Sequence, residues 1–354
     1  MLVRYCTTPD GNIERRALLY LADEHKIDNA DIDGDAIRVI KRLKKSGFEA
    51  YLVGGAVRDL LIGRKPKDFD IATSALPKQV RKLFSHSRII GRRFKLVHIY
   101  YTGKNRERKI FEVSTFRAEQ SGQNNNIYGT LAEDVWRRDY TLNALFYCPL
   151  KRIIIDYVDG LKDIRAGRIR PLGDPESSFM EDPVRMIRGI KYAATTGFQL
   201  PGTLAGMIKK LRRELSRCSP ERVTEEVYKI LASGYAADVL KLAFRLRLLE
   251  VILPALDEYL RSGRKRENQS TYFAALGRLD RQVAKNANVQ SSRGILLTFL
   301  LETVLAANSA EILEPEIMMQ ELRRLALPLL PSKRELETAV RKIRRHRKSP
   351  AQFR

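Results

Sequence analysis

The sequence predicts an α+β fold for the amino-terminal half of the chain and an all-helical fold for the rest. Strand-like runs rich in β-branched and aromatic residues alternate with helical segments up to about residue 170. Beyond residue 181, strand signals vanish and apolar residues recur at helical spacing. The 354 residues are enough for two or more compact units. We therefore expect an extension, a head, a helical region and a second helical region with a basic tail, at residues 1–32, 33–170, 171–265 and 266–354.

Each element of the head is predicted from a local signal. Residues 1–30 are polar and weakly patterned, so we interpret them as a short extension. A helix is expected over residues 33–47 because its apolar residues have helical spacing and Gly47 can end it. The further expected elements are a strand at 49–53, a short helix at 56–61, a strand at 68–73, a helix entered through 74–77 and ending near 84, strands at 94–101 and 109–116, and a helix around 131–145.

The net charge of the chain indicates which class of partner it binds. The 65 Lys and Arg residues against 42 Asp and Glu residues leave a net charge of +23. Such an excess favours a polyanionic partner, either a nucleic acid or an anionic membrane surface. No stretch of about 18 apolar residues exists, and the best candidate, residues 294–307, is interrupted by polar side chains. We expect no membrane insertion.

The cysteines and histidines indicate the compartment and exclude one kind of metal site. The three cysteines and four histidines are widely scattered, so no zinc-binding set can be drawn. The first residues lack the charged and then apolar layout of a secretory signal. We therefore expect reduced cysteines and a cytoplasmic location.

Two aspartates suggest the chemistry. On the expected strand at 68–73, Asp68 and Asp70 would project from the same face, with Cα atoms roughly 6–7 Å apart. That spacing suits two magnesium ions about 3.5–4 Å apart, and magnesium prefers carboxylates together with substrate phosphates. An Asp-x-Asp pair alone could equally be a solvated strand end. We take Asp68 and Asp70 as the metal ligands.

A glycine pair precedes these aspartates. Gly54 and Gly55 stand between a strand and a helix, where backbone N–H groups can approach a triphosphate. Arg58 on that helix could pair with the same phosphates. A Gly-Gly pair alone is unspecific, but beside the aspartates it predicts a nucleotide-binding site.

These segments resemble the first motif of the polymerase-β-like nucleotidyltransferases, and more narrowly the class II group of bacterial poly(A) polymerases and tRNA CCA-adding enzymes. The resemblance covers roughly residues 35–260 and includes four further motifs, at residues 111–117, 137–145, 181–188 and 221–226. It implies a polymerase-β-like head with a mixed sheet, followed by an all-α neck, body and tail.

Two of these motifs add candidate site residues in the head. The resemblance assigns Arg138, Asp139 and Asn143 to ribose recognition and active-site support, with Asp139 counted as catalytic. On the expected helix Asp139 and Asn143 would also share a face, so a plain hydrogen-bonded pair is the alternative. Glu112 could be a third acidic residue near the metals, or it could form a salt bridge to Arg117 or Arg92.

The motif at residues 181–188 concerns base selection. Asp182 accepts and Arg185 donates hydrogen bonds, so together they could read a base without a template. In the family this Glu-Asp-x-x-Arg element selects ATP, or ATP and CTP, and Arg188 shares its helix face. Asp182 as a mere N-cap of a helix starting at Pro183 is the alternative. We interpret Arg222 and Glu226, on the following helix, as supports.

The expected reaction is attack of an RNA 3′-OH on the α-phosphate of ATP, with Mg²⁺ as cofactor and pyrophosphate as leaving group. The run from Gly91 through Arg92 and Arg93 to Phe94 resembles the poly(A) polymerase branch. A short loop at 117–127 and a modest basic tail depart from that branch. We therefore expect a poly(A) polymerase, with a CCA-adding or A-adding enzyme as the main alternative.

Two further classes rank lower. An inactive RNA-binding relative would be expected to lose one of the paired aspartates, and both are present. A DNA repair polymerase would be expected to show a helix-hairpin-helix glycine motif, and none is evident. The expected partners are RNA 3′ ends and ATP, with no membrane, no predicted protein partner and a monomeric chain. RNA phosphates would be held by cations of the helical half, namely Lys209, Lys210, Arg212, Arg213, Arg264, Lys265, Arg266 and the tail.

Overall fold

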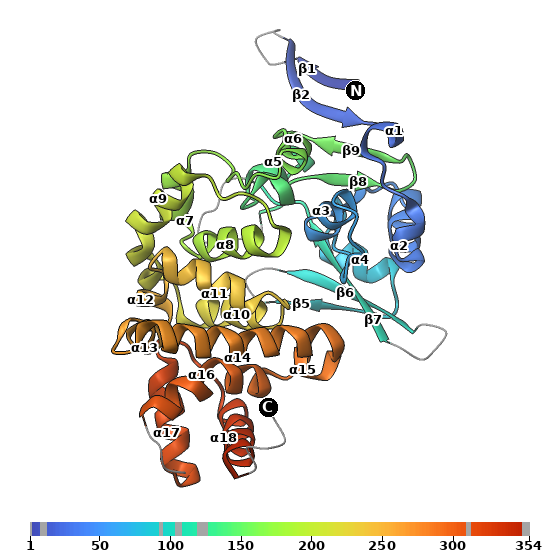
Figure 1. Cartoon of the computed structure of the whole chain (residues 1–354). Helices are drawn as coiled ribbons and strands as arrows, with labels where there is room; N and C mark the ends of the chain where they lie inside the picture. The colour runs from blue at the N-terminus through green and yellow to red at the C-terminus, as the bar shows by residue number, and fades with distance from the viewer. Residues whose placement is uncertain are drawn as a thin grey trace. The chain divides into compact units, whose positions relative to one another are not determined.

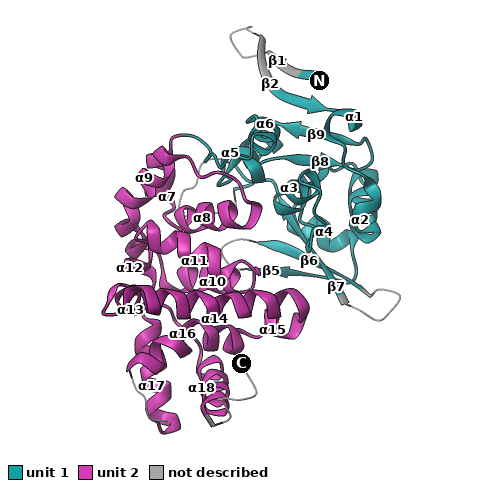
Figure 2. Cartoon of the chain, in the orientation of Figure 1, with its two compact units in different colours: residues 1–173 teal, residues 174–354 magenta. Residues whose placement is uncertain are grey.

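The computed structural model forms two compact units, residues 1–173 and residues 174–354 (Figure 2). It describes residues 2–7, 13–91, 95–102, 108–118, 127–308 and 313–348. Within these residues, every strand lies in the first unit, and the second unit is helical. The predicted α+β head followed by an all-helical region is confirmed.

Nine strands of the described chain form one mixed sheet in the first unit (Figure 1). In sheet order they are β1 (Leu2–Thr7), β2 (Ile13–Tyr20), β9 (Ile153–Asp156), β8 (Phe146–Cys148), β3 (Ala50–Val53), β4 (Ile71–Thr73), β7 (Arg108–Thr115), β6 (Leu96–Thr102) and β5 (Ser87–Ile90). Neighbouring strands are antiparallel except β4 and β7, which are parallel. The predicted strands near 94–101 and 109–116 correspond to β6 and β7.

The helices of the first unit pack on or beside this sheet. They are α1 (Ala22–His25), η1 (Asn29–Asp31), α2 (Gly34–Lys45), α3 (Gly55–Leu61), α4 (Pro77–Leu83), α5 (Leu131–Trp136), η2 (Thr141–Asn143) and α6 (Gly160–Arg165). The side chain of Asp33 caps α2, and Gly47, with φ of +86°, ends it. The buried stripe on α2 that includes Val39 and Leu43 packs against β3 and β4. The predicted helix at 33–47 is confirmed to within two residues.

The strand predicted at 68–73 is shorter than expected. Pairing between β3 and β4 begins at Leu52 and Ile71, because β3 then turns away toward α3. A single further bond, from Val53 N to the carbonyl oxygen of Asp70, extends the pairing. Side-chain exposure still alternates before β4, since Phe69 is buried while Asp68 and Asp70 are exposed.

The interpretation of residues 1–30 as a plain extension is wrong. β1 and β2 form an antiparallel hairpin, and β2 continues the sheet by pairing Leu18 to Tyr20 with β9. β9 lies more than 130 residues along the chain from this hairpin. The strand forms because that distant partner supplies its hydrogen bonds, a cause that local patterning does not reveal.

The helix predicted around residues 131–145 is also wrong beyond Trp136. Tyr140 takes extended backbone and bridges to Pro171, and Thr141 N donates to the carbonyl oxygen of Arg170 at 3.0 Å. A single 3₁₀ turn, η2, then leads into the fully buried strand β8. Pairing with the distant segment around residue 171 therefore replaces the expected helical turns.

The second unit consists of helices in its described residues. They are α7 (Pro175–Glu181), α8 (Val184–Thr196), α9 (Gly202–Leu211), η3 (Arg212–Arg217), α10 (Pro220–Leu231), α11 (Ala236–Arg245), α12 (Leu249–Ile252), α13 (Pro254–Arg261), α14 (Lys265–Lys285), α15 (Ala287–Ser291), α16 (Arg293–Asn308), α17 (Pro315–Ala326) and α18 (Lys333–Lys348). Helix α8 packs on α10 and α11, and α16 packs on α10, α14, α17 and α18. Among the described helices, none is both long and apolar enough to cross a membrane.

A close backbone approach holds η2 in place. The carboxylate of Asp156 accepts bonds of 3.0 Å from the N–H groups of Val158, Gly160 and Leu161, which orders the loop from β9 into α6. A Cβ added to Gly160 would lie 2.4 Å from the carbonyl oxygen of Thr141. The start of α6 can therefore pack on η2 only without a side chain at this position.

We expect Gly160→Ala to destabilise the first unit by about 2 kcal/mol, because overpacking forces the backbone of η2 to shift. Urea unfolding measures this change. Gly34→Ala is the control, since a Cβ there meets nothing within 4 Å. Equal free energies of unfolding for the two variants would contradict the proposed contact.

Candidate active site

The turn between β3 and α3 forms one wall of the candidate site. Gly54 has φ of +68° and ψ of −134°, a conformation that other residues rarely adopt. A Cβ on Gly54 would lie 3.8 Å from Arg138 Nη1 and 4.0 Å from Asp70 Oδ2. A Cβ on Gly55 would lie 3.4 Å from Arg58 Nη2. The turn thus brings together a carboxylate and two guanidinium groups predicted from the sequence.

A series of hydrogen bonds joins α3 to η2. Arg58 donates from Nη1 to Asn143 Oδ1 at 2.9 Å, and Asn143 donates from Nδ2 to Asp139 Oδ1 at 3.3 Å. Arg58 also donates twice to Oδ1 of Asp59, at 2.9 and 2.7 Å. The Arg58 guanidinium, expected to pair with phosphates, therefore makes internal bonds that position Asn143. Asp139 and Asn143 do contact each other, but through a 3₁₀ turn and not along an α-helix.

Arg138 is held by a residue that the sequence analysis missed. Asp134, a buried residue, accepts from Arg138 Nη2 at 2.8 Å and from the N–H of Arg117 at 3.2 Å. Arg138 Nη1 also reaches the carbonyl oxygen of Asn143 at 3.3 Å, and its guanidinium lies 4.8 Å from the centre of the Phe146 ring. The spacing of four residues between Asp134 and Arg138 was the available signal.

The parallel strands β4 and β7 align the acidic residues. Ile71 pairs with Val113, so Asp70 and Glu112 each stand one position before a paired residue. Because paired residues of a sheet share a face, this register places Glu112 on the same face as Asp70. Glu112 also pairs across to His98, with Nε2 and Oε1 3.3 Å apart. Glu112 therefore lies against His98, and the alternative of a salt bridge to Arg117 or Arg92 stays a prediction.

The exposed carboxylates could hold a hard cation. In the described part of the chain, no three His, Cys, Asp or Glu side chains gather as a ready metal site. Asp68 and Asp70 would then supply only part of a coordination shell, and magnesium takes the remainder from substrate phosphates and water. Arg92 and Arg93, expected near this site, lie outside the described residues.

The residues predicted for base recognition belong to the second unit, where α7, α8 and α10 hold them. Asp182 ends α7 and accepts from Arg222 Nη2 at 3.0 and 2.8 Å. Arg185 donates from Nη1 to Ser178 Oγ and to Glu181 Oε2, both at 2.9 Å. The alternative in which Asp182 caps α8 is wrong, because Pro183 is the capping residue and no side chain caps it.

Arg188 binds a buried carboxylate. Glu226 is 2% exposed and accepts from Arg188 at 3.0 Å, Lys191 at 2.9 Å and Lys229 at 3.4 Å. Burial alone would raise the pKa of the Glu226 carboxyl, but Lys191, Arg188 and Lys229 together lower it to about 2. Arg222 and Glu226 thus tie α10 to the turn between α7 and α8 and to α8 itself, as the sequence analysis expected.

We expect Glu226→Gln to destabilise the second unit by about 3 kcal/mol at neutral pH, because it leaves the partly buried cations of Arg188 and Lys191 without their carboxylate. The pKa of Glu226 is lower in the folded chain than its ordinary 4.5, so its stabilisation is complete above pH 4.5 and is lost as pH falls toward 2. Unfolding measured across this range should show the two proteins converging at low pH. Exposed Glu221→Gln is the control, and a difference that does not depend on pH would contradict this account.

Comparison with protein families gives two matches. The model described as "Poly A polymerase head domain" matches residues 50–170. The model described as "Probable RNA and SrmB- binding site of polymerase A" matches residues 197–260. The first range contains the Gly54 turn, the acidic residues and η2, and the second contains Arg222 and Glu226.

Curated relatives carry two different names. The chain is 42% identical over 253 residues to a poly(A) polymerase I of Escherichia coli O6:H1, covering 67% of this chain and 53% of the relative. It is 36% identical over 229 residues to a CCA-adding enzyme of Bacillus pumilus, covering 63% and 56%. The chain therefore spans little more than half the length of these relatives.

Solved structures share the fold. The crystal structure of the Bacillus stearothermophilus CCA-adding enzyme in complex with CTP is 29% identical, with a TM-score of 0.59 over 89% of this chain and 82% of that one.

Proposed function

Because the chain belongs to the nucleotidyltransferase family that includes poly(A) polymerases and CCA-adding enzymes, we propose that it adds AMP from ATP to the 3′-OH of RNA, without a template. The main support is the arrangement at the Gly54 turn, where Asp70 and Arg138 both approach a backbone without a side chain. A triphosphate needs such an opening between carboxylates and a guanidinium.

The candidate site residues of the head have separate roles in this proposal. Asp68 and Asp70 would hold magnesium, which neutralises the triphosphate and lowers the pKa of the attacking hydroxyl. Asp139 and Asn143, fixed through Arg58, would hold the ribose. Catalysis then comes from positioning and charge stabilisation, without a covalent nucleophile.

Two further parts of the proposal concern a third carboxylate at the metal site and the recognition of the nucleotide base. Glu112 shares the face of Asp70, which supports a role as a third carboxylate at the metals. Asp182 and Arg185, supported by Arg222 and Glu181, would read the edge of adenine. That reading needs one side chain that accepts hydrogen bonds and one that donates them.

The choice of poly(A) addition follows the degree of similarity. Identity to the poly(A) polymerase relative, 42%, exceeds the 36% to the CCA-adding relative. CCA addition remains the second candidate because the Bacillus stearothermophilus CCA-adding enzyme, 29% identical, was solved in complex with CTP. A cytoplasmic, monomeric enzyme acting on RNA 3′ ends completes the proposal.

We expect Asp68→Asn and Asp70→Asn each to lower nucleotide addition at least about a hundredfold, because metal-assisted charge stabilisation is lost. RNA affinity should persist, since the substituted residues are acidic. Radiolabelled ATP incorporation and RNA binding are measured on the same samples. Asp31→Asn, an exposed site on η1, is the control, and retained turnover in either active-site variant would overturn the assignment.

Offering single nucleotides separates the two candidate activities. With ATP alone, a poly(A) polymerase extends an unstructured RNA by many residues. With a tRNA trimmed at its 3′ end, a CCA-adding enzyme requires CTP before ATP and then stops. We expect long ATP-dependent products on unstructured RNA, resolved on sequencing gels. Addition limited to CTP, CTP and ATP on the trimmed tRNA would replace the proposal with CCA addition.

A further inference from the structure

A groove in the second unit lies outside both regions matched by the family models. It has a volume of about 440 Å³, and helices α14, α16 and α18 line it, with Val289 of α15 at one side. The matched region ends at residue 260, whereas the groove is built from residues 271–346. Its volume falls in the range of roughly 300–1,000 Å³ that small-ligand sites occupy. We name it the α14–α18 groove.

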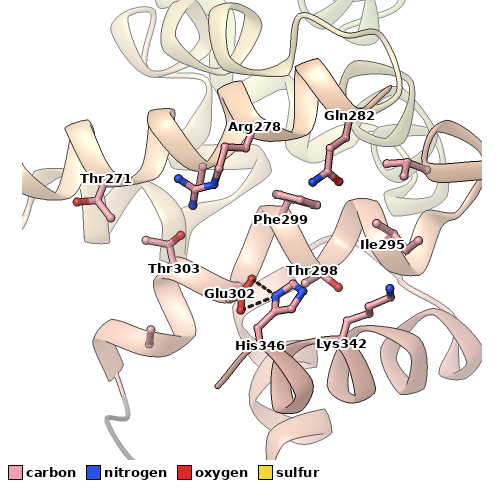
Figure 3. Close-up of a pocket in the computed structure, with 13 residues that line it drawn as sticks. Thr271, Arg278, Gln282, Ile295, Thr298, Phe299, Glu302, Thr303, Lys342 and His346 are labelled. Atoms are coloured by element: carbon pink, nitrogen blue, oxygen red, sulfur yellow. Dashed lines mark hydrogen bonds and ion pairs between the residues drawn. The ribbon is translucent and has the colours of Figure 1, made fainter. Parts of the chain in front are cut away.

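The floor of the α14–α18 groove is apolar. Helix α16 is apolar on most of its faces, and such a helix is normally covered all round. Ile295 and Phe299, one turn apart, are nevertheless only half-buried and face the groove. Figure 3 shows Phe299 between the α14 side chains above and Lys342 below. The groove therefore offers an aromatic side chain to a flat apolar group.

The rim of the groove is cationic and polar. Arg278 and Gln282 extend from α14, and Lys342 extends from α18 (Figure 3). Among the described residues, neither Arg278 nor Lys342 has an acidic partner, although many other cations of this unit are ion-paired. The groove's carboxylate, Glu302, is already held by His346 Nδ1 at 3.1 and 3.2 Å. The groove thus presents two cations that form no ion pair among the described residues, beside a carboxylate that His346 already engages.

These features select one kind of occupant. A flat apolar surface beside positive charge matches a nucleotide, whose base stacks on an aromatic ring and whose phosphate pairs with cations. Exposed cations continue beyond the rim on the same helices, at Arg281 of α14 and at Arg341 and Arg345 of α18. Positive charge that extends past the groove favours a strand over a free nucleotide.

We propose that the α14–α18 groove binds one unpaired nucleotide of an RNA strand, with the base against Phe299 and the flanking phosphates at Arg278 and Lys342. The proposal rests on the proposed function in so far as RNA is the substrate. It adds a discrete binding site in the second unit, built from residues other than those proposed for the chemistry. The groove would hold the RNA body without reading its sequence, because stacking accepts any base.

The charge contribution is tested by paired substitutions in the full chain. Arg278→Gln with Lys342→Gln removes the two rim cations, and Arg245→Gln with Arg323→Gln, on α11 and α17, removes two exposed cations of the same unit that do not line the groove. We expect the rim pair to weaken binding of a short fluorescent oligoadenylate about tenfold more than the control pair, measured by anisotropy at one salt concentration. Equal losses for the two pairs would overturn the site.

The stacking contribution is tested separately. Phe299→Leu keeps the apolar volume and removes the ring, so we expect about fivefold weaker binding of oligoadenylate. Binding of a ribose-phosphate oligomer without bases should stay unchanged. Equal loss for both oligomers would overturn the base contact. Self-association of the chain that the rim substitutions abolish would likewise overturn the proposal, in favour of a second copy as occupant.

Nucleotide addition on the same samples separates this inference from the proposed function. With a saturating short primer, the rim variants should retain the turnover of the unsubstituted chain. If that chain adds no nucleotide but shows the groove-dependent RNA binding, the proposed function fails and the groove stands. If it adds nucleotides and the rim and control pairs behave alike, the groove alone fails.

Discussion

The chain has 65 lysines and arginines and only 42 acidic side chains, so their mutual repulsion favours placing individual arginines against a carboxylate. In two places, a single buried carboxylate holds the guanidinium group of an arginine in one direction. Asp134 orients Arg138 in the head, and Glu226 gathers Arg188 and Lys191 in the helical unit. Each such carboxylate is held by hydrogen bonds from its cations, so the desolvation that burial imposes is offset.

Both units hold their candidate site residues in place through internal hydrogen bonds and ion pairs. In the head, candidate site residues are fixed by their neighbours, as Arg58 fixes Asn143. In the helical unit, Arg222 grips Asp182 with two bonds and so sets the turn between α7 and α8. These internal ion pairs fix the direction of each arginine, because a hydrogen-bonded carboxylate holds a guanidinium group in a defined geometry.

Elements with a local signal were predictable, and elements made by distant pairing were not. The capping residue Asp33 and the stop at Gly47 located α2. The hairpin of β1 and β2 and the 3₁₀ turn η2 depend on partners more than 25 residues away, so patterning misassigned both. The prediction placed Asp70, Arg138 and Gly54 in one site, and the structure brings them together. Asp134 and His98 were missed because their importance comes from what they touch and not from a motif.

The parallel pairing of β4 with β7 has a consequence for how such chains can vary. The chain leaves β4, forms α4, β5 and β6, and returns as β7 beside the strand it left. The intervening segment lies at one edge of the sheet formed by the described strands, where β5 pairs with β6. Insertions or deletions there change the length of the segment between β4 and β7, whose two ends are held by the pairing of these strands. Changes at this edge therefore leave the register of Asp70 and Glu112 intact. The edge segment can vary in evolution while the two carboxylates stay on one face.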